Sequence, residues 1–208
     1  MDFLTEAIAK LGATPQQAEE LVRGLTEEQL SWRASESHFS LRENVLHLRD
    51  IDIEGYEQRV RLILGQDCPT LPDVNGGQLA VERNYNAQPV PPALEDFGRS
   101  REASVERLKA SSEADLERKA EMLGVGVITL RRLLELWMEH DRGHLSDMAE
   151  LRLAIESGEA PRFVVSPARP RFCFSLETDG SDPRGSAREL RRTFIETPGC
   201  EAGIDRDR

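Results

Sequence analysis

Two long segments of the chain repeat apolar residues at steps of three and four, the spacing that gives a helix one buried face. The first spans residues 41–65 and follows a capping box formed by Ser40 and Glu43. The second spans residues 129–158 and ends at Gly158, a residue suited to terminating a helix. Both segments are therefore predicted to be long amphipathic helices that pack on a common core.

The N-terminal region carries signals for shorter helical pieces. A first short helix is expected to end near Gly12. A new helix is then predicted, with Thr14 as its N-cap and Pro15 at its first position. Thr26 and Gln29 form a second capping box, which predicts one more turn of helix.

The middle of the chain is predicted to contain a long connection followed by another helix. Residues 68–92 are rich in Pro, Gly and Asn and are too long for a tight turn, so we expect a crossover with a helical turn at 78–85. A helix is predicted at 93–109, and residues 119–130 are predicted to be irregular or hairpin-like. The expected fold class is all-α, a four-helix bundle with a long crossover between its second and third helices.

The character of the chain changes after the last predicted helix. Residues 1–158 are expected to form the bundle, whereas residues 159–208 are Pro- and Arg-rich and weakly periodic. We expect this C-terminal segment to be an irregular, largely disordered tail, with one helix at 186–194 as the exception.

Composition narrows the classes of function. The 208 residues carry a formal net charge of −11, which disfavours nucleic-acid binding because that requires a basic face. No stretch is apolar enough for a membrane span, and the N-terminus lacks the pattern of a signal peptide. The three cysteines are widely scattered, as is common in a reducing compartment. A cytoplasmic protein without membrane or nucleic-acid partners is expected.

The placement of a few histidines is the strongest sign of chemistry. His140 and His144 lie four residues apart on the last predicted helix, so both imidazoles can reach one point. His47 lies between two leucines on the first long helix and four residues before Ile51, so it is also expected to face the core. Three such histidines match the usual number of protein ligands in a catalytic zinc-type site. The alternatives are histidines on a solvated face or histidines kept only for packing, and His38 is expected to be an ordinary loop histidine.

The motifs around these histidines resemble those of a known family. The stretch SWRASESHFSLRENVLHLRDIDIEGY, the Pro-rich crossover and the stretch ITLRRLLELWMEHDRGHLSDM are similar to the DinB/YfiT-like superfamily over residues 14–156. The resemblance implies a four-helix bundle whose triad, here His47, His140 and His144, holds nickel, zinc or another divalent ion, often in a homodimer. It also implies activities such as S-transfer from low-molecular-weight thiols (bacillithiol, mycothiol or glutathione) and thiol-dependent isomerisation.

Several acidic residues near the triad are candidates for supporting roles. Asp50 and Glu54 follow His47 near its face, so either could orient an imidazole or act as a catalytic general base; the alternative is a solvated acidic face. Asp141 makes the motif H-D-x-x-H, which is similar to the H-E-x-x-H of zinc proteases. A peptidase is disfavoured because no further histidine ligand follows His144.

These observations lead to a functional hypothesis with a rival. The hypothesis is a metal-dependent hydrolase or transferase acting on a small molecule, with a low-molecular-weight thiol as the candidate nucleophile. Zinc or nickel is the favoured cofactor, and manganese or iron would also suit a His-rich site. The rival is a non-catalytic, stress-associated module in which the ion staples the bundle, with Asp50 or Glu54 as a fourth ligand.

Overall fold

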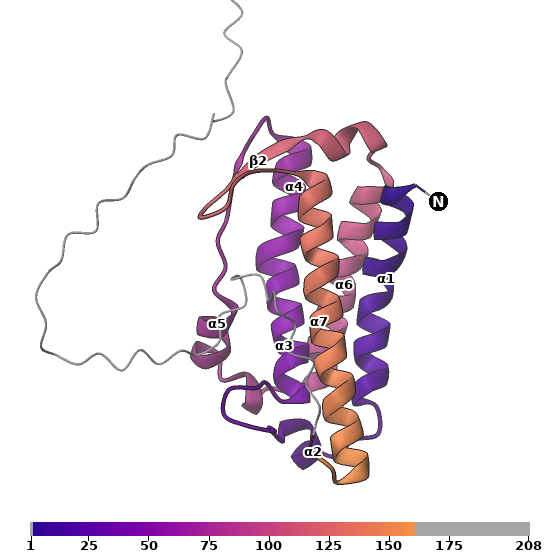
Figure 1. The fold of residues 1–208 in the computed structure, drawn as a ribbon, viewed down its shortest axis with the longest axis vertical. Helices are drawn as coiled ribbons and strands as arrows, with labels where there is room; N and C mark the ends of the chain where they lie inside the picture. The colour runs from indigo at the N-terminus through magenta and orange to yellow at the C-terminus, as the bar shows by residue number, and fades with distance from the viewer. Residues whose placement is uncertain (1, 161–208) are drawn as a thin grey trace, which may run out of the picture.

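The computed structural model describes residues 2–160, and the predicted tail lies almost wholly outside them. Four long helical stretches lie side by side along the length of the molecule (Figure 1). They are α1 (Phe3–Val22), α3 (Leu41–Ile51) continued by η1 (Asp52–Tyr56) and α4 (Glu57–Gly65), α6 (Val90–Lys109), and α7 (Leu130–Ser157). The predicted all-α class and four-helix bundle are confirmed.

Helix α1 differs from its prediction, because it continues without interruption through Pro15. The predicted break between Gly12 and Thr14 is therefore wrong. A proline within a helix lacks the N–H that would bond the carbonyl four residues earlier, at a cost of about 3 kcal/mol. Here that carbonyl belongs to Leu11, and it accepts a hydrogen bond of 2.6 Å from Nη1 of Arg101 instead. A charged donor from another helix thus satisfies the group that Pro15 releases.

The second long helix begins as predicted and contains an irregular turn. The reciprocal capping box of Ser40 and Glu43 is present at its start. Residues Asp52–Tyr56 form η1, a π-helical turn between α3 and α4. Turns of this kind are rare, and they are frequently found at functional sites.

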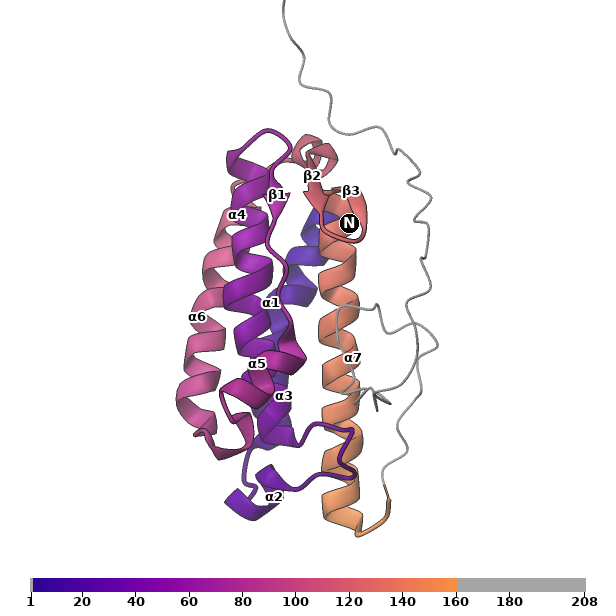
Figure 2. The same cartoon turned by 90° about the vertical axis from the view of Figure 1, so that its left-hand side faces the viewer.

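The connections carry short elements. Helix α2 (Glu27–Ser31) has the predicted capping box at Thr26. The crossover contains β1 (Thr70–Leu71), α5 (Gly76–Glu82) and η2 (Tyr85–Ala87), and the segment between α6 and α7 contains η3 (Glu113–Glu117), β2 (Lys119–Met122) and β3 (Gly126–Thr129). Strands β2 and β3 form a hairpin, one of the two alternatives expected for residues 119–130, and β1 adds a parallel strand to it. Figure 2 shows the strands at the α4 end of the bundle and α5 against α3.

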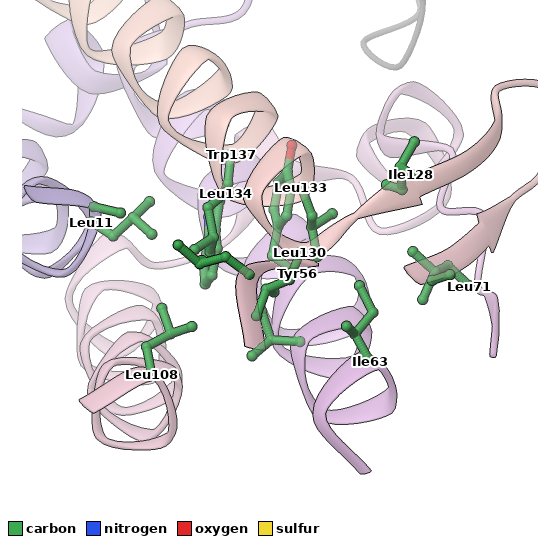
Figure 3. Packing of buried hydrophobic residues seen from close by; sticks show 14 of the residues in the cluster. Leu11, Tyr56, Ile63, Leu71, Leu108, Ile128, Leu130, Leu133, Leu134 and Trp137 are labelled. Atoms are coloured by element: carbon green, nitrogen blue, oxygen red, sulfur yellow. The ribbon is translucent and has the colours of Figure 1, made fainter. Parts of the chain in front are cut away.

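The core consists of two apolar clusters. The first lies at the strand end of the bundle, where the rings of Tyr56 and Trp137 stack with centroids 4.8 Å apart (Figure 3). Trp137 is fully buried in this cluster. The second cluster contains Leu46, Phe97 and Met148. Among the described residues, no helix has the length and apolar character needed to cross a membrane.

A layer of buried polar side chains lies between the two clusters. On α7, Trp137 belongs to the first cluster and Met148 to the second, and the polar positions fall between them. On α1, Leu11 and Ala18 bracket a buried threonine in the same way. We call this set the polar layer; its members are Thr14, Asn44, His47, Asp52, Arg101, His140, Asp141 and His144.

Candidate metal centre

The three predicted ligand histidines meet inside the bundle. His47 comes from α3, and His140 and His144 come from consecutive turns of α7. All three are buried, and one ligand nitrogen from each lies within 4.8 Å of the others. The Nε2 atoms of His47 and His140 are 3.2 Å apart. The structure therefore brings together, from two helices, the set that the sequence predicts.

The partner of His144 fixes the orientation of its ring. The side-chain amide of Asn44 donates to the carbonyl of Ser40 at 2.9 Å, and a carbonyl can only accept. The oxygen of the Asn44 amide must therefore be the atom that faces His144, at 2.8 Å from its Nδ1. This requires a proton on Nδ1 of His144, so Nε2 is the nitrogen whose lone pair would bind a cation.

His140 has an acidic partner on the corresponding nitrogen. Its Nδ1 lies 3.4 Å from Oδ1 of Asp141, and its Nε2 faces His47. A carboxylate favours a proton on the Nδ1 that it faces, so Nε2 of His140 is again the nitrogen with the lone pair. Neutral imidazoles whose second nitrogen is hydrogen-bonded are the usual ligands of zinc and related ions. The residues present thus fit a divalent metal ion, whose identity the donor set leaves open.

A glycine in the crossover makes room for His47. Gly76 is the first residue of α5, and a Cβ placed on it would lie 2.4 Å from Cε1 and 2.8 Å from Nδ1 of His47. Real side chains do not approach so closely, so only glycine allows α5 to pack on this imidazole. The sequence offered a weak signal in the Asn75-Gly76-Gly77 run, but nothing in it indicated that the turn contacts the triad.

On the far side of His140 the polar layer contains a buried ion-pair network. Arg101 donates from Nε to Asp52 at 2.8 Å and from Nη1 to Asp141 at 2.7 Å. Burial opposes ionisation of Asp141, yet the attraction of Arg101 and the hydrogen bond with His140 lower its pKa to about 2. For Asp52, burial outweighs Arg101 and raises the pKa. The sequence analysis missed Arg101 and Asp52, because their pairing depends on contacts between separate helices.

This network also explains why Asp141 differs from the carboxylate of a zinc protease. Its Oδ2 accepts from Arg101 and, at 2.9 Å, from the hydroxyl of Thr14. A carboxylate engaged in this way and held ionised is a poor general base for a bound water.

A groove of about 1220 Å³ lies between α1 and α7, and its lining includes Thr14 and Asp141.

The two predicted catalytic carboxylates have other partners. Asp50 is buried and accepts from Arg83 at 2.7 Å and from the hydroxyl of Tyr85 at 2.6 Å, and Glu54 pairs with the same Arg83. Burial opposes ionisation of Asp50, but its hydrogen bonds, above all that from Arg49, lower its pKa. These contacts hold the crossover on α3. The catalytic roles considered for Asp50 and Glu54 stay predictions.

His38 lies in the loop before α3. Its Nδ1 is 2.7 Å from the hydroxyl of Ser35, and the ring is partly exposed. These contacts suit the loop role predicted for it.

Comparison with known proteins agrees with the fold. The sequence model of the DinB superfamily matches residues 10–148. Among solved structures, YfiT from Bacillus subtilis, described as a probable metal-dependent hydrolase with an unusual four-helix bundle topology, superposes with a TM-score of 0.68 at 19% identity, covering 76% of this chain and 90% of YfiT. No curated protein sequence matches the chain. Because the family match extends over more than half of its length, the chain belongs to the DinB superfamily.

Proposed function

We propose that the protein is a metal-dependent enzyme that binds one divalent ion through His47, His140 and His144 and acts on a small molecule. The observation that carries this proposal is the convergence of three buried imidazole nitrogens within 4.8 Å of one another. Three protein ligands leave coordination positions for a substrate, whereas structural zinc sites usually have four.

The chemistry follows from what such a site supplies. A bound divalent ion lowers the pKa of a coordinated thiol or water and so provides a nucleophile at neutral pH. Asn44 holds the imidazole of His144 in the orientation that binding requires. The ring centroid of Phe39 lies 5.3 Å from that of His47, and the ring centroid of Tyr56 lies 5.6 Å from that of His140. These two aromatic rings limit the access of bulk water. We favour a low-molecular-weight thiol as the nucleophile, with S-transfer as the reaction and hydrolysis as the second candidate.

The description of YfiT as a probable metal-dependent hydrolase supports the second candidate. The rival, a purely structural ion, needs a fourth protein ligand, and Asp50 and Glu54 were the candidates. Both pair with Arg83 in the structure, which favours an open coordination position. Cytoplasmic location and a homodimer remain part of the proposal.

Metal analysis is the first test. We expect about one zinc, nickel, manganese or iron ion per chain in the wild type and a clear loss of it in His144→Ala. The matched control is His38→Ala, which removes a loop imidazole and should leave metal content unchanged. Equal metal content in wild type and His144→Ala would contradict the proposed site.

Activity distinguishes the two reactions. Protein loaded with each metal would be assayed for conjugation of glutathione, mycothiol and bacillithiol to electrophiles, and for hydrolysis of small esters and amides. Metal-dependent thiol conjugation lost in His144→Ala is the expected result. Hydrolysis without thiol dependence would replace S-transfer by the second candidate, and inactivity in both assays with metal bound would favour the structural ion.

A further inference from the structure

We propose that Asp141 is a positioning residue for His140, and that Arg101 and Thr14 hold Asp141 in the orientation that the metal centre needs. The inference rests on the proposed function, because it concerns how the proposed ligands are held. It assigns a role to a buried network that the three histidines alone do not explain.

The two oxygens of Asp141 have separate tasks. Oδ1 faces Nδ1 of His140 at 3.4 Å. Oδ2 accepts from Arg101 at 2.7 Å and from Thr14 at 2.9 Å. Since Asp141 and His140 are neighbours on one helix, the carboxylate would otherwise be free to rotate away from the ring. Two donors on Oδ2 fix the rotation, and Oδ1 is thereby directed at the imidazole.

Arg101 is itself held from several sides. Besides Asp141, it donates to Asp52 on η1 and to the carbonyl of Leu11 on α1. The faces of Trp137 and Phe97 lie 4.6 Å and 4.9 Å from its guanidinium carbon. A planar guanidinium with these contacts has one orientation available, so it can act as a fixed reference for Asp141.

Pro15 contributes to the same arrangement. Without an N–H on residue 15, the Leu11 carbonyl lacks its usual helical donor, and the guanidinium of Arg101 donates to it instead. The proline therefore creates the acceptor that draws Arg101 toward α1, next to Thr14. The network thus connects all four long stretches of the bundle to one metal ligand.

Substitutions that change charge in opposite directions separate a positioning role from a direct electrostatic effect on the ion. Replacing Asp141 by Asn removes a negative charge near the ion and also loosens the ring, so both effects weaken metal binding. Replacing Arg101 by Met removes a positive charge, which by electrostatics alone would strengthen cation binding. If Arg101 positions Asp141, its loss weakens binding instead. Thr14→Val changes no charge and tests positioning alone.

The experiment is a titration of full-length apoprotein with Zn²⁺ and with Co²⁺, the latter followed through its visible absorption bands. We expect Asp141→Asn to bind about 10–100-fold more weakly than wild type, the usual effect of removing a partner of a metal-ligating histidine. Arg101→Met should also bind more weakly, and Thr14→Val should show a smaller loss in the same direction. Thr14→Ser keeps the hydroxyl and should bind as wild type does.

Controls separate folding from positioning. Arg59→Met removes another buried arginine, one that donates to the carbonyl of Pro72, and should leave metal affinity unchanged. The thermal midpoint of each apoprotein identifies variants that do not fold, and the Thr14 pair then provides the test. A second readout is the ¹⁵N spectrum of the zinc-loaded wild type, in which His140 should carry its proton on Nδ1.

The possible outcomes are distinct. Wild-type affinity in Asp141→Asn and Thr14→Val, tighter binding in Arg101→Met, or a proton on Nε2 of His140 would overturn the positioning role and leave the proposed function intact. A wild-type protein that binds neither Zn²⁺ nor Co²⁺ would overturn both.

Discussion

The two apolar clusters and the polar layer between them follow different rules. The clusters are built from leucines and aromatic rings at helical spacing, and many combinations of similar volume would fill them. The polar layer consists of groups that are costly to bury unless each has its partner, as Arg101 has in Asp52 and Asp141. The two apolar clusters at its ends therefore give the bundle most of its stability. The polar layer between them depends on exact pairing, and its contacts hold the histidines.

The largest effect on stability is expected from breaking the polar layer at its centre. Arg101→Met leaves the carboxylates of Asp52 and Asp141 buried near each other without their cation, which costs about 3–5 kcal/mol. Urea unfolding of the apoprotein measures this change. A loss below 1 kcal/mol would show that the network is solvated and that the layer resembles a surface more than a core.

Truncating a side chain in an apolar cluster should cost a similar or smaller free energy of unfolding, but it should leave metal affinity unchanged. Leu133→Ala removes a fully buried side chain of the first cluster, at a cost of about 2–4 kcal/mol. Because Leu133 belongs to this cluster and not to the polar layer, metal affinity of the folded variant should stay at the wild-type value. Weaker metal binding in folded Leu133→Ala would mean that the two regions are mechanically coupled.

The same contrast explains which features could be predicted from the sequence. Helix limits depend on local signals, and the capping boxes at Thr26 and Ser40 and the stop at Gly158 are where they were expected. The triad could be found because His140 and His144 share a helix face by spacing alone.

Features that depend on contacts between distant segments could not be predicted. Pro15 indicated a helix start, but α1 continues through it, and a hydrogen bond from Arg101 replaces the one that the Leu11 carbonyl loses. The fit of Gly76 against His47 depends on the path of the crossover, which composition does not determine. Asp50 was expected near the triad or in solvent, and it is buried against Arg83 and Tyr85, which the crossover brings to it.

Gly76→Ala tests how closely the crossover and the metal centre are fitted. The added methyl group would overlap the ring of His47, so either α5 or the imidazole must move, at a cost of about 1–3 kcal/mol. We expect metal affinity to fall as well, measured by Zn²⁺ titration. The matched control is Gly98→Ala on α6, where a Cβ meets nothing within 4 Å. Unchanged affinity in Gly76→Ala would show that α5 moves and the imidazole of His47 stays in place.

Acid should weaken the attachment of the crossover through Asp50. Its pKa is lowered in the folded protein, chiefly by the hydrogen bonds of Arg49 and Tyr85 against the opposing effect of burial. A lowered pKa gives stability that is fully present above the unfolded value of about 3.9 and is lost as pH falls through the folded value. The difference in unfolding free energy between wild-type and Asp50→Asn apoprotein should therefore shrink below about pH 4. A difference that is constant from pH 7 to pH 3 would contradict this.

The smallest effect is expected at Gly143, which lies on α7 between the two histidines of the motif. The residue is exposed, and a Cβ there meets nothing within 4 Å. Gly143→Ala should therefore stabilise the helix by about 0.5–1 kcal/mol, because glycine is the less favourable residue in a helix interior. Thermal unfolding measures the gain, and Zn²⁺ affinity should not change. Reduced activity at unchanged affinity and raised stability would instead place the substrate against the exposed side of α7 that carries Gly143.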